Sequence, residues 1–176
     1  MRTIVISILF FVLGFSSVFA QEDGKFRAGA DIGCLFPHEG AFGLLGAIEL
    51  KYNLKKNMDV GLKPEFASYI KDKNSHGRLF SFSISYDYYF HTTGKRSSPL
   101  VGVGLGYYFC EVSDVNILSN FNNPTCFIRA GYEIGKFRMS LAYNLIRKPS
   151  EMNPNDRNRD YISLTVGVYF GGGKWK

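Results

Sequence analysis

The segment Gly77–Phe90, GRLFSFSISYDYYF, alternates between two kinds of side chain. From Phe80 to Phe90 the even-numbered positions are apolar or aromatic, whereas the odd-numbered positions include three serines and Asp87. Side chains of a β-strand point to opposite faces at every second residue, so this period of two predicts a strand whose faces meet different surroundings. The fold depends on which of these faces points outward.

The same alternation recurs along the chain and predicts eight strands. They are expected at 24–36, 41–53, 57–71, 77–91, 98–110, 122–135, 136–147 and 159–171. Frequent glycine and aromatic residues with little proline suit strands joined by turns rather than helices. Pro64 lacks a backbone donor, so a local bulge is expected in the third segment. The predicted fold class is all-β, an eight-stranded antiparallel up-and-down barrel.

Residues 1–20 have the features of a secretory signal peptide. Arg2 precedes an apolar run, and Val18-Phe19-Ala20 has small residues at its first and third positions, so cleavage is expected after Ala20. Residues 21–176 then form one β-barrel domain, with no later apolar run long enough for a transmembrane helix. Removing Arg2 lowers the formal net charge of +6 by one. The remaining Lys and Arg do not cluster, which argues against nucleic-acid binding.

Two kinds of eight-stranded barrel fit this pattern. A soluble calycin-like barrel places its apolar face inside and encloses a hydrophobic ligand. A transmembrane barrel places the apolar face outside, against lipid. Alternation alone does not separate them, so the composition of each face has to decide.

The polar face has small residues and balanced charges. Serine, alanine and glycine recur on it, including Gly102, Gly104 and Gly106, and suit a narrow lumen rather than a solvated sheet. Charges buried in such a lumen need partners of opposite sign. The charged residues that the alternation places on this face, six cations and six anions, are Lys25, Arg27, Asp31, Glu49, Lys51, Asp59, Lys63, Glu65, Asp87, Arg129, Glu133 and Arg138. They predict a salt-bridged plug rather than an open conduit.

The apolar face carries aromatic residues near the strand ends. Examples are Phe26 and Phe137 near one set of ends, and Phe36 and Phe109 near the other. Aromatic girdles of this kind mark the two interfaces of a bilayer. Short links after the second, fourth and sixth strands and longer ones after the third, fifth and seventh (72–76, 111–121, 148–158) suggest periplasmic turns and outer loops. Both observations favour the transmembrane barrel in the outer membrane of a Gram-negative bacterium.

The complete pattern resembles the small outer-membrane β-barrel superfamily that includes the OmpX-like, OmpA-barrel-like and opacity-type proteins. Residues Tyr161–Phe170, YISLTVGVYF, are similar to the C-terminal strand signal read by the barrel assembly machinery, although the chain continues into GGGKWK. This short Gly-Lys tail is similar to that of barrels from the Bacteroidetes. The resemblance implies fold and location, and the superfamily has no single activity. Contact with outer-membrane lipid is expected from the outward apolar face.

Several residues could carry chemistry. Outer-membrane lipid A acyltransferases and deacylases are also eight-stranded barrels that use His with Ser and an acid at the outer rim. His38 with Glu39, and His76 with Ser75 and Asp72, are the candidates here, while His91 is expected at the periplasmic side. No sequence motif supports a catalytic role for these histidines. A general base at one of these positions is therefore kept only as an alternative.

Cys110 and Cys126 flank the loop predicted at 111–121 and could form a disulfide in an oxidising compartment, but they stand at positions of opposite parity. No spacing indicates a metal site or a cofactor. The outer rim is moderately basic and could pair with lipopolysaccharide phosphates; its cations are Lys71, Lys73, Arg78, Arg147, Lys148, Arg157 and Arg159.

The favoured function is a non-enzymatic, monomeric outer-membrane barrel with a structural or surface-interaction role. The alternatives are an outer-rim enzyme that modifies lipid A, and a narrow channel or carrier of a hydrophobic ligand.

Overall fold

The computed structural model describes residues 23–38, 42–72, 75–90, 97–114, 117–146 and 160–172. The predicted signal peptide and the tail after residue 172 lie outside these ranges. Within them, no helix is long and apolar enough to cross a membrane.

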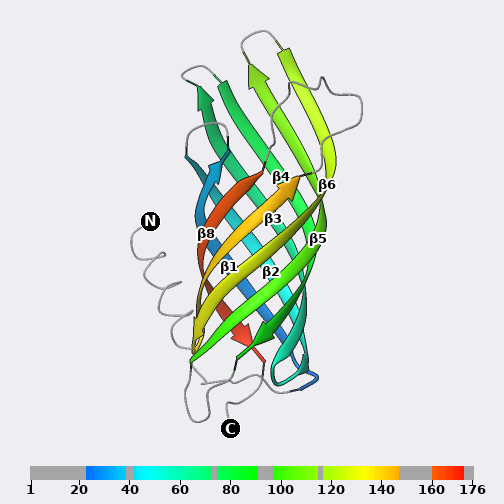
Figure 1. Cartoon of the computed structure of the whole chain (residues 1–176), viewed down its shortest axis with the longest axis vertical. Coiled ribbons are helices and arrows are strands. Elements are labelled where there is room, and N and C mark those ends of the chain that lie inside the picture. Colours follow the sequence, from blue (N-terminus) through cyan, green and yellow to red (C-terminus); the bar gives the residue numbers. More distant parts are fainter. Residues whose placement is uncertain are drawn as a thin grey trace, which may run out of the picture.

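Eight antiparallel strands close into a barrel in chain order, as predicted (Figure 1). The strands are β1 (Phe26–Pro37), β2 (Gly43–Lys55), β3 (Met58–Asp72), β4 (Ser75–Tyr89), β5 (Ser97–Asp114), β6 (Ile117–Ile134), β7 (Phe137–Ile146) and β8 (Tyr161–Gly171). Pairing of β1 with both β2 and β8 completes the closure. A closed barrel leaves no lateral edge where all eight strands are present.

Three local predictions were wrong. The segment 72–76, expected to be a longer loop, is strand at Asp72 and at residues 75–76, because β3 and β4 pair as far as Asp72 opposite Ser75. The segment 111–121, expected to be a loop, is mostly strand, because pairing of β5 with β6 continues to Asp114 opposite Ile117. Pro64 forms no bulge: it lies opposite Phe82, and the register of β2 with β3 is the same before and after it. The register of β2 with β3 shifts between Asn53 and Lys55 instead.

The apolar face points outward. In β4, Phe82 and Ile84 are 45% and 58% exposed, whereas Ser83, Ser85 and Asp87 are buried. The other strands repeat this arrangement, with exposed Val, Leu, Ile and Phe outside and buried polar residues inside. This is the predicted orientation, and it is the reverse of a soluble barrel that encloses an apolar ligand.

The four strands β3 to β6 are the longest. They have 15, 15, 18 and 18 residues, whereas β1, β2, β7 and β8 have 12, 13, 10 and 11. Figure 1 shows the β3–β4 and β5–β6 hairpins projecting beyond β7 and β8 at the upper end of the barrel. In the described residues, pairing of β6 with β7 ends at Thr125 opposite Ile146, so residues 117–124 of β6 pair with β5 alone.

Candidate functional site: the barrel interior

The barrel interior contains three successive levels of side chains. A charge network occupies the end where β1 begins, and an apolar cap occupies the end where β1 finishes. Hydroxyl and amide side chains lie between them, together with Lys63 and Glu65. Each level follows from the inward-facing positions of the eight strands, because alternate residues of every strand point into the lumen.

Arg129 of β6 is held by two carboxylates of other strands. Its Nε donates to Asp87 Oδ1 at 2.6 Å, and its Nη2 donates to Glu49 Oε1 at 2.7 Å. A second, short hydrogen bond joins Nη2 to Asp87 Oδ2, so the guanidinium contacts Asp87 in a bidentate manner. Bidentate geometry makes such charge-assisted pairs both strong and specific in orientation.

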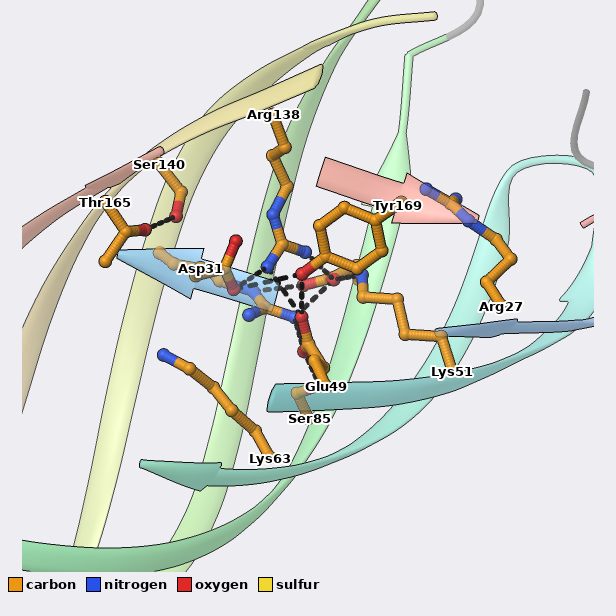
Figure 2. Close-up of polar contacts among 12 residues, drawn as sticks. Arg27, Asp31, Glu49, Lys51, Lys63, Ser85, Arg138, Ser140, Thr165 and Tyr169 are labelled. Atoms are coloured by element: carbon orange, nitrogen blue, oxygen red, sulfur yellow. Dashed lines mark hydrogen bonds and ion pairs between the residues drawn. The ribbon is translucent and has the colours of Figure 1, made fainter. Parts of the chain in front are cut away.

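Arg138 of β7 extends the network to β1 and β8. Its Nη2 lies 2.8 Å from Asp31 Oδ2 and 2.6 Å from Glu49 Oε2. The Tyr169 hydroxyl donates to the same two carboxylates, at 3.1 Å to Asp31 and 2.5 Å to Glu49. Figure 2 shows Arg138 and Tyr169 converging on Asp31 and Glu49, with the Tyr169 ring beside the guanidinium. Glu49 therefore joins both arginines and fixes the centre of the network.

Lys51 and Arg27 complete the network toward the end of the barrel where β1 begins. The Lys51 ammonium donates to Asp59 at 3.1 Å and to the Tyr89 hydroxyl at 2.9 Å, and it is also bonded to Asp87. Arg27 donates to Glu133 at 2.6 Å. These contacts join β1, β2, β3, β4 and β6, so the ion pairs span the lumen instead of following one strand.

Glycine in the intervening strand makes two of these ion pairs possible. Gly102 of β5 lies opposite both Asp87 and Arg129, and Gly167 of β8 lies opposite both Asp31 and Arg138. A Cβ atom at Gly102 would overlap Asp87 Oδ1, and one at Gly167 would overlap Asp31 Oδ1. Long side chains of next-nearest strands therefore meet above a residue that has no side chain.

Eleven of the twelve predicted lumen residues are buried in the barrel interior. Lys25 is the exception and the prediction for it was wrong: it precedes β1 and is exposed. Without Lys25, the predicted set consists of five buried cations and six buried carboxylates. All eleven form ion pairs. Arg27, Lys51, Arg129 and Arg138 connect nine of them into one network, and Lys63 and Glu65 form a separate pair at 2.7 Å.

The middle level is polar but narrow. Ser140 and Thr165 hydroxyls are hydrogen-bonded at 2.7 Å, Asn144 donates to Ser163 at 3.3 Å, and Tyr161 donates to Glu65 at 2.9 Å. The cavity between these side chains is small: the centre of a water molecule could occupy a volume of only about 10 Å³ in it. A cavity of that size is near the smallest that holds one water, so the lumen is closed here.

The apolar cap was missed by the sequence analysis. Its buried members are Leu35, Leu45, Ala67, Leu79, Tyr108, Cys110, Ile146 and Tyr161. Half-buried Tyr69 packs against them, with its hydroxyl 3.7 Å from Cys110 Sγ. These residues stand at inward-facing positions in their strands, so parity was the signal that could have found them. Tyr89 and Tyr169, which serve the charge network, were missed for the same reason.

The described residues assemble no catalytic or metal-binding group. His38 lies exposed at the end of β1, whereas Glu39, His91 and the side chains of Asp72, Ser75 and His76 lie outside the described residues. Among the residues that are described, no group of three His, Cys, Asp or Glu side chains could hold a metal ion.

The three cysteines are free thiols. Cys110 lies opposite Phe121 and Cys126 lies opposite Leu105, so the two are far apart in register. Cys110 is buried in the apolar cap, whereas Cys126 is half-buried at an outward-facing position. The disulfide considered from the sequence is therefore not formed.

Solved structures with a similar fold include barrels of the bacterial outer membrane. Neisserial surface protein A aligns with a TM-score of 0.67 and 19% identity over 87% of this chain and all of that chain (100%). The N-terminal barrel of Pseudomonas aeruginosa OprF aligns with a TM-score of 0.56 and 18% identity, covering 85% of this chain and 100% of that one. The outer-membrane enzyme PagL gives 0.56 and 14%, covering 82% and 98%.

No protein-family model matches the sequence, and no curated protein matches it. At these identities the structural likeness establishes the fold alone. The chain has the fold of the small eight-stranded outer-membrane β-barrels, as its resemblance to them implied. None of these structures supports an origin in the Bacteroidetes, and the tail 173–176 lies outside the described residues.

Proposed function

We propose that this chain is an integral β-barrel of the outer membrane of a Gram-negative bacterium, exported by a signal peptide that is cleaved after Ala20. The observation that carries the proposal is the inverted polarity of the barrel. Leu105, Ile84 and Val103 on the outer face are 71%, 58% and 54% exposed, while charged side chains fill the interior. A barrel of this polarity is stable when hydrocarbon surrounds it.

Two bands of exposed aromatic residues support the same location. Phe26 and Phe137 lie at the end where β1 begins, and they are 74% and 64% exposed. Phe36 and Phe42 lie at the other end, 47% and 49% exposed, with their ring centroids 5.9 Å apart. Aromatic side chains prefer the level of the lipid headgroups, so the two bands mark the two bilayer interfaces.

The barrel has a structural or surface-interaction role rather than a conducting one. The charge network, the narrow polar level and the apolar cap close the lumen in succession. The strands β3 to β6 exceed the roughly 9–11 residues that a bilayer requires and extend past its outer interface. Among the described residues, 117–124 of β6 pair with β5 alone, and a strand edge of this kind can pair with an extended segment of another protein.

The remaining partners follow from the membrane location. Outer-membrane lipid contacts the apolar face, and lipopolysaccharide phosphates lie at the level of exposed Arg78. The barrel assembly machinery recognises residues 161–170 during insertion. The barrel acts as a monomer without nucleic acid, metal or cofactor.

Cysteine labelling of intact cells tests the location and the orientation together. In a variant whose native cysteines are replaced by serine, Asn122→Cys on the projecting part of β6 reacts with a membrane-impermeant maleimide. Asn57→Cys, in the turn between β2 and β3, is the matched control and reacts only after lysis. Labelling of Asn57→Cys on intact cells, or of neither position, contradicts the proposal.

The enzymatic alternative has its own test. Mass spectrometry compares lipid A from cells with and without the protein. We expect identical profiles, because the described residues bring no nucleophile, base and acid together. A change in lipid A acylation that depends on His38 or His76 would contradict the non-enzymatic role.

A further inference from the structure

Four lysines surround one end of the barrel and are named here the lysine arc: Lys25, Lys55, Lys56 and Lys136. Lys25 precedes β1, Lys55 and Lys56 lie at the β2–β3 turn, and Lys136 lies at the β6–β7 turn. The first three are exposed and Lys136 is half-buried. The arc runs from the start of β7, past the end of β8 and the start of β1, to the β2–β3 turn. These strands are consecutive around the barrel, so the arc follows one continuous part of the rim.

Three members of the arc are adjacent in sequence to an exposed apolar residue. Lys25 precedes Phe26, which is 74% exposed, and Lys136 precedes Phe137, which is 64% exposed. Lys55 follows Leu54, which is 47% exposed. One strand residue advances about 3.3 Å, so the backbone of these lysines lies about one residue beyond the exposed apolar residues. That is the level at which the phosphates of a bilayer lie.

The side chain of Lys136 shows how the arc meets the membrane surface. Its Nζ lies 5.5 Å from the centroid of the Phe170 ring, which belongs to the outward-facing aromatic band. The ammonium therefore lies over the outer surface of the barrel and not in its mouth. An aromatic ring below and a phosphate above are compatible partners for one ammonium group, because each occupies a different side of it.

The charge of this rim is strongly positive in the described residues. The described residues beyond the aromatic band are 23–25, 54–57, 135–136 and 172. They include four lysines and one acidic residue, Asp23. The lumen carboxylates closest in sequence to the arc, Asp59 and Glu133, are buried and paired with Lys51 and Arg27, at 3.1 Å and 2.6 Å. The lumen network therefore does not neutralise the arc.

We propose that the lysine arc binds the phosphate groups of anionic phospholipids in the membrane leaflet at this end of the barrel. The inference rests on the proposed membrane location. Each lysine near an anionic membrane surface strengthens association by about fivefold. The arc thus selects anionic over zwitterionic lipids as neighbours of the barrel and fixes its depth in the bilayer.

The test measures the lipid preference of the refolded full-length mature chain. The barrel is placed in phosphatidylcholine vesicles, and electron paramagnetic resonance compares the immobilised fraction of spin-labelled phosphatidylglycerol with that of spin-labelled phosphatidylcholine. We expect the native barrel to prefer phosphatidylglycerol by about fivefold and high salt to weaken this preference. The variant Lys25→Gln/Lys55→Gln/Lys56→Gln/Lys136→Gln should lose it, and the matched four-arginine variant should retain it.

Three results would overturn the inference: an unchanged preference in the glutamine variant, loss of the preference in the arginine variant, or a native preference that salt does not alter. If the glutamine variant fails to insert, the salt dependence of the native barrel decides the question. Failure of the native barrel itself to insert, seen as the absence of a boiling-dependent shift in gel migration, contradicts the proposed function rather than the lysine arc.

Discussion

Asp87 of β4 and Arg129 of β6 bind each other across Gly102 of the strand between them. The three residues share one register line, and the Arg129 Nε lies 2.6 Å from Asp87 Oδ1. Arg138 and Asp31 repeat this arrangement across Gly167. The closed lumen thus depends on glycines as much as on charges, because each glycine opens the path along which the charged side chains meet.

Replacing Gly102 with alanine should destabilise the barrel. The new Cβ would overlap Asp87 Oδ1 and displace it from Arg129. We expect a loss of about 2–4 kcal/mol in the free energy of unfolding, from overpacking and a weakened ion pair. Urea unfolding in phospholipid bilayers measures this loss. Gly46→Ala is the control, since the nearest atom to its Cβ would be 4.0 Å away, and equal effects of the two substitutions would refute the explanation.

Removing the Arg129 guanidinium should leave two buried carboxylates, Asp87 and Glu49, each without one of its cationic partners. For Arg129→Gln we expect a loss of about 3–5 kcal/mol in the free energy of unfolding, because Asp87 and Glu49 are both fully buried. Asp87→Asn should offset part of this loss, with a coupling of at least about 1 kcal/mol in a double-mutant cycle. Strict additivity of the two substitutions would show that the pair is not coupled.

The apolar cap should respond to truncation as a protein core does. Leu79 is 1% exposed inside the cap, whereas Ile84 of the same strand is 58% exposed toward the lipid. Leu79→Ala is expected to cost about 2–4 kcal/mol through loss of contacts and a cavity. Ile84→Ala should cost less than Leu79→Ala, because acyl chains fill the space left by the side chain and only the transfer free energy is lost, without a cavity. The same unfolding measurement compares the two variants, and a larger effect at Ile84 would contradict the assigned faces.

The cysteines should remain reduced even in an oxidising compartment. Cys110 points into the cap and Cys126 stands at an outward-facing position of the neighbouring strand, so their Cβ atoms cannot approach within disulfide geometry. Alkylation in denaturant without reductant, followed by mass spectrometry, should modify all of Cys34, Cys110 and Cys126. A peptide pair linked through Cys110 and Cys126 would show that the register of β5 with β6 is wrong.

Strand alternation predicted the parts of this structure that depend on residue parity. The outward position of Phe82 and Ile84 and the inward position of Ser85 and Asp87 follow from a period of two, once small side chains had identified the lumen. Where a strand begins or ends depends on pairing with its neighbour, which parity does not contain. Lys25 was therefore placed in a lumen that begins two residues later, with Arg27, and 111–121 was expected to be a loop although β5 and β6 pair through most of it.

The contents of the lumen were predicted by charge but not by level. The balance of charges predicted Glu49 and Arg138 in the lumen. It did not predict Leu35 and Leu79, although each stands at an inward-facing position of its own strand. The sequence also did not indicate which charged residues form ion pairs, because Glu49 of β2 and Arg138 of β7 meet only when the barrel closes. Closure is a property of the whole sheet, and no single segment of sequence encodes it.

The most direct test compares how strongly brominated lipid quenches a tryptophan on the outer face of the barrel and a tryptophan in its lumen. With Trp175 replaced by phenylalanine, one variant carries Leu105→Trp on the outer face and a second carries Phe127→Trp in the lumen. Leu105 is 71% exposed and Phe127 is 6% exposed. In vesicles of lipids with brominated acyl chains, we predict strong fluorescence quenching for Leu105→Trp and almost none for Phe127→Trp. Quenching of Phe127→Trp with protection of Leu105→Trp would contradict the central claim that the apolar face meets lipid around a closed, charged interior.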